Sequence, residues 1–82
     1  MSPVESELLS KLRQLYDEYE RLNRKIRDAN IRHRYLKDPE AVERAANEER
    51  QYLAEINRLM DRLRAVEGQI MQVRKTGRRR FQ

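Results

Sequence analysis

The feature that most constrains this chain is a heptad repeat of mostly apolar residues that runs through nearly all of its 82 residues. The repeat alternates spacings of four and three residues on each side of Asp38, which places the repeating side chains on one side of an α-helix. We call these residues the seam. The first set is Leu8, Leu12, Leu15, Tyr19, Leu22, Ile26, Ala29, His33 and Leu36, and the second set is Val42, Ala45, Glu49, Tyr52, Ile56, Leu59, Leu63, Val66, Ile70 and Val73.

Two helix start signals divide the chain. Ser2, followed by Pro3 and Glu5, has the pattern of a capping box, and Asp38 followed by Pro39 repeats the N-cap and the proline at the first helical position. Proline also disfavours helical geometry in the residue before it, so the first helix must end shortly before Asp38. The sequence therefore predicts two helices separated by a very short turn.

The predicted hairpin covers residues 1–76, with a helix at about 3–36, a turn at about 37–38 and a helix at about 39–76. Gly77 favours a helix stop, which leaves residues 77–82 as a basic tail. A turn this short makes the helices antiparallel. The predicted fold class is all-α, a two-helix antiparallel coiled-coil hairpin. Because one hairpin leaves half of each seam side chain in water, we expect two hairpins to pair into a four-helix bundle.

The residues that flank the seam differ between the two edges of the predicted hairpin. On one edge, which we call the charged edge, three of the four facing pairs across the helices carry opposite charges. An exposed pair of this kind contributes only about 0.2–1 kcal/mol, so its main effect is on register and orientation. The facing residues are Arg32 with Glu48, Lys25 with Glu55, Glu18 with Arg62, and Lys11 with Gln69.

The other edge, which we call the apolar edge, carries Leu9, Tyr16, Leu53 and Met60 with no charged pair between them. At roughly 25 cal/mol per Å² of apolar area, covering these four side chains would supply several kcal/mol. We therefore expect a homodimer that forms through this edge. The alternative is that the four residues are ordinary flanks of a wide helical stripe.

The net charge of +5 is concentrated at the end of the chain, where residues 74–82 contain five cations and no acid. These cations are Arg74, Lys75, Arg78, Arg79 and Arg80. Such a run favours salt-dependent binding to phosphates, so the alternative function is that of a small basic nucleic-acid-associated protein. A basic end can also dock on an acidic protein or simply increase solubility.

A third surface lies on the outward face of the first helix near the turn. Its residues are Arg24, Arg27, Ile31, Arg34 and Tyr35. Exposed apolar side chains among arginines fit contact with an acidic protein or a phosphate backbone. The alternative is a solvated face with scattered apolar residues, which is common on monomeric proteins.

His33 and Glu49 interrupt the apolar seam near the turn. They lie one layer apart across the predicted helix pair, within reach of a hydrogen bond. We interpret them as a buried polar layer that fixes the register, with a pH-sensitive contact as the alternative. One histidine and scattered carboxylates do not form a recognisable metal-ligand pattern.

The sequence contains no pattern that is typical of catalysis. It has no cysteine, no Gly-rich loop and no Ser/His/Asp arrangement, and a two-helix rod has no deep cavity. We expect no enzyme activity, no cofactor, no metal and no small-molecule substrate. No stretch approaches the roughly 20 apolar residues that a membrane span needs. We expect a soluble, cytoplasmic protein without a membrane partner.

In size and layout the chain resembles the small hairpin phosphatases that act on sporulation response regulators. The likeness consists of a helix, a short turn with a proline, and a second helix. That family carries a Ser-Gln-Glu-Leu-Asp signature early in the second helix, whereas the corresponding stretch here is Ala45-Ala46-Asn47-Glu48-Glu49. The resemblance therefore implies the hairpin shape and no activity. We expect a non-enzymatic protein-protein interaction module that acts as an adaptor, regulator or assembly factor for a protein partner.

Overall fold

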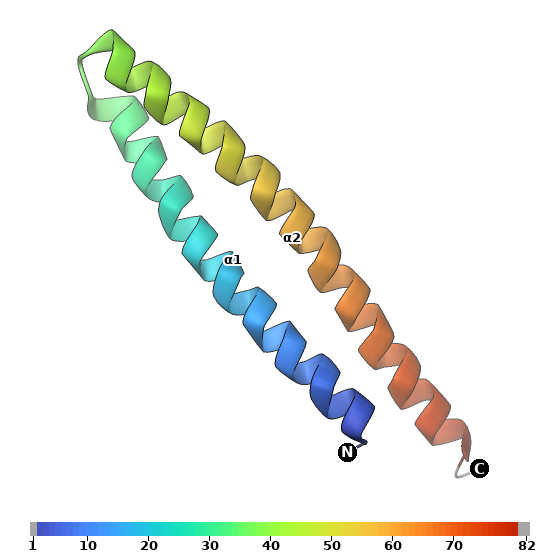
Figure 1. Cartoon of the computed structure of the whole chain (residues 1–82). Coiled ribbons are helices and arrows are strands. Elements are labelled where there is room, and N and C mark those ends of the chain that lie inside the picture. The colour runs from blue at the N-terminus through green and yellow to red at the C-terminus, as the bar shows by residue number, and fades with distance from the viewer. Residues whose placement is uncertain (1, 81–82) are drawn as a thin grey trace.

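The computed structural model describes residues 2–80 of the chain, with side chains for residues 2–77. Within this range the protein is an all-α hairpin, as predicted. Helix α1 (Pro3–Tyr35) and helix α2 (Pro39–Arg80) lie side by side and run in opposite directions (Figure 1). The rod measures 65 × 15 × 13 Å. Neither helix contains an apolar stretch of the length needed to cross a membrane.

Helix α1 begins at the predicted cap. Ser2 has extended backbone geometry, and its side-chain oxygen accepts a hydrogen bond of 3.1 Å from the backbone N–H of Glu5. The Glu5 carboxylate points elsewhere, because its Oε1 accepts a hydrogen bond of 2.6 Å from Nε of Arg74 on α2. Only the serine half of the capping box is therefore used for capping. The helix ends at Tyr35, and the Leu36 N–H donates to the Arg32 carbonyl at 3.0 Å.

Helix α2 begins as predicted but ends later. The Asp38 carbonyl accepts the first helical hydrogen bond, 2.9 Å from the Val42 nitrogen. The predicted end near Thr76 is wrong, because α2 continues through Gly77 to Arg80. A glycine stops a helix by adopting a positive φ, and none of the described glycines does so. The described part of the predicted tail, residues 77–80, is therefore helical, and residues 81–82 lie outside the described range.

The buried side chains all belong to the predicted seam. Leu15 packs with four residues of α2, and this cluster is the hydrophobic core of the rod. Leu8, Leu9, Leu12, Tyr19 and Leu22 of α1 pack against it and stay half-exposed. The α2 members of the core are Leu59, Leu63, Val66 and Ile70, each 4–6% exposed. The α2 side of the seam is thus better covered than the α1 side.

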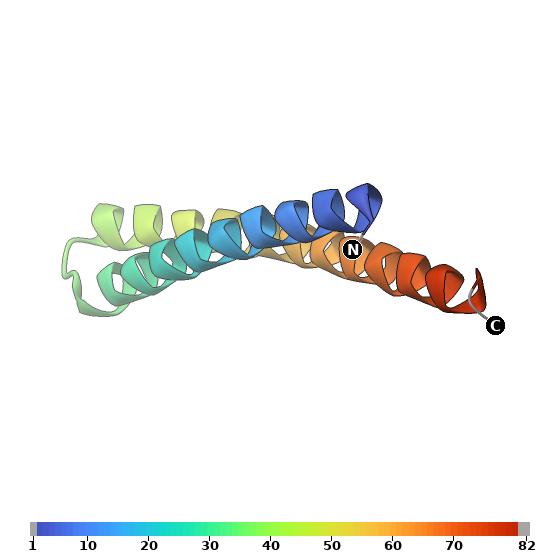
Figure 2. The same cartoon turned by 90° about the horizontal axis from the view of Figure 1, so that it is seen from below.

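The two ends of the rod differ. At the turn end the buried residues are small: Ala29 is 0% exposed and Ala45 is 1% exposed. At the opposite end, which we call the open end, α2 projects beyond the start of α1 (Figure 2). The basic C-terminal segment therefore begins beside α1, where Arg74 contacts Glu5, and its end at Arg80 lies on the part of α2 that projects.

Candidate interaction surfaces

The charged edge forms only one of its predicted ion pairs. Arg32 Nη2 lies 2.6 Å from Glu48 Oε2, and Arg32 also contacts Asp28 on its own helix at 3.1 Å. The hydrogen bond to Glu48 is the main reason that the pKa of Arg32 is raised. This contact confirms the predicted pairing near the turn, where the helices meet in the expected register.

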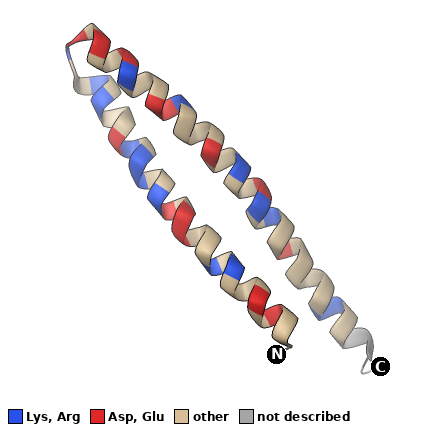
Figure 3. Cartoon of the chain, viewed as in Figure 1, with Lys and Arg blue, Asp and Glu red and all other residues tan. Residues whose placement is uncertain are grey.

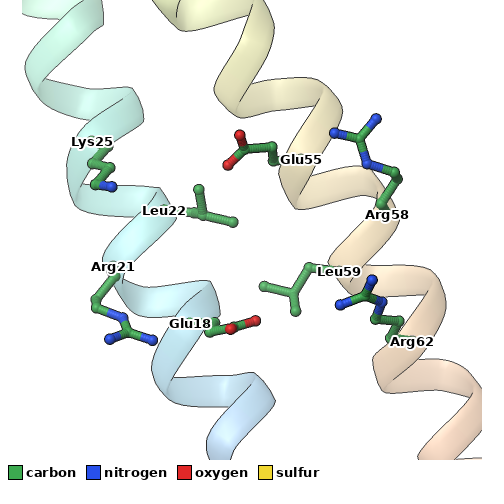
Figure 4. Close-up of a pocket in the computed structure, with 8 residues that line it drawn as sticks. All are labelled: Glu18, Arg21, Leu22, Lys25, Glu55, Arg58, Leu59 and Arg62. Atoms are coloured by element: carbon green, nitrogen blue, oxygen red, sulfur yellow. The ribbon is translucent and has the colours of Figure 1, made fainter.

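Farther from the turn the same edge opens into a groove of about 480 Å³. Its floor contains Leu22 and Leu59, and charged side chains stand along both walls (Figure 4). The walls consist of Glu18, Arg21 and Lys25 from α1 and Glu55, Arg58 and Arg62 from α2. The predicted pairs of Lys25 with Glu55 and Glu18 with Arg62 face each other here. Among the described side chains, none of these six groups forms a salt bridge.

The groove has a sequence signal that heptad analysis alone does not reveal. Residues 18–25 and 55–62 share glutamate, arginine, leucine and a basic residue at identical spacing, 37 positions apart. In antiparallel helices, two such octets that face each other generate an approximate twofold axis through the groove. Comparing the two halves of the sequence would have found the repeat, but not the hollow between the walls.

The apolar edge remains accessible in the hairpin. Tyr16 is 48% exposed and Leu53 is 43% exposed, whereas Leu9 and Met60 are half-buried. Leu9 also packs against the core cluster. All four residues occupy the same heptad position on antiparallel helices, so they follow one edge of the rod. Leu53 and Tyr16 are its most exposed members.

One polar contact crosses the apolar edge. The Tyr16 hydroxyl donates a hydrogen bond of 3.0 Å to Oε1 of Glu67 on α2. This bond and the negative charge of Glu67 raise the pKa of the Tyr16 hydroxyl. The hydroxyl therefore stays protonated, and its hydrogen bond to Glu67 fixes the position of the ring on the apolar edge. A ring with one satisfied polar group is common at protein interfaces.

The polar residues of the seam near the turn form a connected cluster. His33 Nδ1 lies 3.2 Å from Glu49 Oε2, and the Asn30 side-chain amide donates to Glu49 Oε1 at 3.0 Å. The hydrogen bond from Asn30, followed by the one with His33, lowers the pKa of Glu49. The predicted contact is therefore present, but the cluster is not buried: the His33 side chain is 45% exposed and that of Glu49 is 20% exposed.

The outward face near the turn is accessible, as its predicted role requires. Ile31 is 56% exposed and Tyr35 is 75% exposed, and Arg24, Arg27 and Arg34 are exposed beside them. Arg24 lies 3.9 Å from Glu20 on the same helix. Leu36, the seam residue that follows α1, is also exposed, at 42%.

The first of the five cations in residues 74–82 already has a partner within the hairpin. Arg74 is paired with Glu5, as described above, and this ion pair links α2 to α1 at the open end of the rod. Lys75 is exposed. The side chains of Arg78, Arg79 and Arg80 lie outside the described part of the chain. Charged residues are unevenly distributed along α2. The stretch before the basic segment, residues 65–73, contains one charged residue, Glu67, and is mostly tan in Figure 3.

Within the described residues, no group of three or more His, Asp or Glu side chains is placed to hold a metal ion. The hollows found along the rod are open grooves between helices. Comparison with protein-family models gave no match, and neither did comparison with curated proteins or with solved structures.

Proposed function

We propose that this protein is a non-enzymatic helical-hairpin interaction module, an adaptor, regulator or assembly factor, that self-associates through the apolar edge. The observation that carries the proposal is the accessibility of Tyr16 and Leu53 beside a core whose α1 side is half-exposed. Apolar side chains aligned along one edge of a rod are best covered by a second rod. The most economical assembly is a homodimer that forms a four-helix bundle, localised to the cytoplasm.

Two features of the edge support protein contact over other uses. First, its most exposed members, Leu53 and Tyr16, provide large apolar area. The Tyr16 hydroxyl is already satisfied by Glu67, so covering the ring leaves no unpaired polar group. An isologous dimer would use every such side chain twice.

The test is size-exclusion chromatography with light scattering. The wild-type protein is expected at twice the 10.0 kDa mass of the chain, and Leu53→Glu is expected to shift it to the monomer mass. Burying a new carboxylate in an apolar interface without a partner is strongly unfavourable. The matched control is Ala54→Glu, which adds the same charge at the neighbouring exposed position. A dimer that survives Leu53→Glu contradicts the proposal.

A second candidate function is binding to nucleic acid through the C-terminal segment. The observation that favours it is the continuation of α2 to Arg80, which carries the basic segment beyond α1 (Figure 2). A helical overhang would present its cations to a phosphate backbone on regular backbone geometry. Deleting residues 77–82 should then abolish binding to a labelled oligonucleotide and its dependence on salt. Binding that survives this deletion contradicts the second candidate.

A further inference from the structure

The groove on the charged edge has a volume of about 480 Å³, and self-association through the apolar edge would leave it open. The two edges lie on opposite sides of the seam, so a partner could occupy the groove of an assembled dimer. We propose that this groove docks an acidic amphipathic helix of a partner protein. The inference rests on the proposed interaction function, because that function requires a protein partner. The residues of the groove indicate the chemistry of this partner.

The shape of the groove favours a helix as the occupant. It runs between two antiparallel helices, and its floor contains Leu22, which is half-buried, and Leu59, which is 4% exposed. A third helix that lies along this groove can pack one apolar stripe on the two leucines. The residues on either side of that stripe then contact the charged walls. Helices recognised in this way use residues spaced three and four apart, which matches the spacing of the lining residues.

The charges of the walls favour an acidic occupant. Four cations and two carboxylates line the groove, a balance of +2. Glu18 and Glu55 each stand opposite a cation, which leaves Arg21 and Arg58, on the outer sides of the two walls, as the excess charge (Figure 4). Lys25 is partly engaged, because its Nζ lies 5.7 Å from the centre of the Tyr52 ring. Acids on both flanks of a docked helix would meet Arg21 on one wall and Arg58 on the other.

The same lining disfavours two other occupants. A phosphate backbone would approach Glu18 and Glu55 as well as the arginines, and it has no use for a leucine floor. A second copy of this chain, docked groove to groove, would place Arg21 and Arg58 against their own equivalents, and facing like charges are unfavourable. An acidic helix with a leucine stripe meets neither obstacle.

The test uses a synthetic labelled peptide of about 20 residues, with leucine at the two core positions of each heptad and glutamate at the flanking positions. Glutamates on both flanks keep the peptide from pairing with itself. Its binding to the full-length protein is followed by fluorescence anisotropy. The double variant Arg21→Glu/Arg58→Glu is expected to weaken binding at least about tenfold. The neutral double variant Arg21→Gln/Arg58→Gln should give an intermediate loss.

The matched control is Arg13→Glu/Arg50→Glu, which makes the same change in net charge at two exposed positions outside the groove, also 37 residues apart. This control should change binding less than about twofold. Equal losses in both double variants, no binding to the wild type, or oligonucleotide binding that depends on Arg21 and Arg58 would overturn the proposal. Light scattering on the same samples reads self-association separately, so a failure of the dimer cannot be mistaken for a failure of the groove.

Discussion

The half of the hairpin near the open end and the half near the turn are held together by different interactions. Near the open end, Leu15 and the α2 side chains from Leu59 to Ile70 form a continuous apolar core. Near the turn, the buried residues are Ala29 and Ala45, and Ile56 is buried close to the middle of the rod. The hydrogen bonds and ion pairs across the helices here come from Asn30, Arg32 and His33 and lead to two glutamates.

This difference teaches where stability and specificity come from in so small a fold. The two buried alanines contribute little apolar area, so the turn half depends more on the short connection and on partly exposed polar contacts that contribute modestly. The open half supplies most of the apolar burial, although it lies far from the covalent turn. The turn half therefore supplies most of the polar contacts between the helices, and the open half supplies most of the apolar burial.

The largest expected effect comes from the core of the open half. Leu63→Ala should lower the free energy of unfolding by about 2–5 kcal/mol, because it leaves a cavity beside Leu15 and Val66. Urea denaturation followed by circular dichroism, at one protein concentration, measures it. The matched variant near the turn is Leu36→Ala, at a residue that is 42% exposed, and its cost should stay below about 1 kcal/mol. Equal costs would break the comparison.

Overpacking tests the turn half from the other direction. Ala29 is 0% exposed, so Ala29→Leu has no space to enter and should cost about 1–3 kcal/mol. The same denaturation assay applies. Ala65→Leu, at an exposed position of α2, is the control and should be nearly neutral. If Ala29→Leu stabilised the protein, the helices near the turn would have room for a larger core than the structure shows.

A smaller effect is expected at the cap of the open end. Ser2→Ala removes the side-chain acceptor of the Glu5 N–H and should cost about 1 kcal/mol. Thermal melting resolves this loss against Ser10→Ala, an exposed serine in the body of the same helix. A loss confined to Ser2 would show that the start of α1 is held by its cap as well as by the core. Equal losses would mean that serine removal acts through helix propensity alone.

The smallest expected effect is the acid sensitivity of the turn half. The pKa of Glu49 is lowered from 4.5 by Asn30 and His33, so the folded state binds this proton less readily than the unfolded state. Its stabilisation is present above about pH 4.5 and is lost as the pH falls through the lower folded value. Melting temperatures of wild type and Glu49→Gln should therefore converge on acidification. A difference that stays constant from about pH 6 to about pH 3 would contradict the assignment.

Much of the fold could be predicted from local sequence. Pro39 and its neighbours mark the turn, Ser2 marks the start of α1, and the heptad repeat identifies every buried residue in the described chain. The end of α2 could not be predicted in the same way. Gly77 permits a left-handed stop but does not require one, so the glycine follows the helix when nothing pulls the chain away.

The candidate surfaces were predictable as sets of residues and less so as contacts. On the charged edge three pairs of opposite charge were expected, yet only Arg32 and Glu48 meet, and the next two pairs stand apart across a groove. The Glu49 cluster was expected to be buried, but His33 stays 45% exposed because a two-helix rod cannot enclose a long polar side chain.

The sequence alone determined that this chain forms two antiparallel helices with one apolar seam, because helix period, caps and proline act over a few residues. Only the tertiary structure decided which charges pair and which line a groove. Beside the small buried residues Ala29 and Ala45, Arg32 meets Glu48. Beside the larger Leu22 and Leu59, the charged side chains line a groove and form no salt bridge among the described residues. The length of the side chains and the exact position of the helices at each level decide between these outcomes, and the sequence pattern does not specify them.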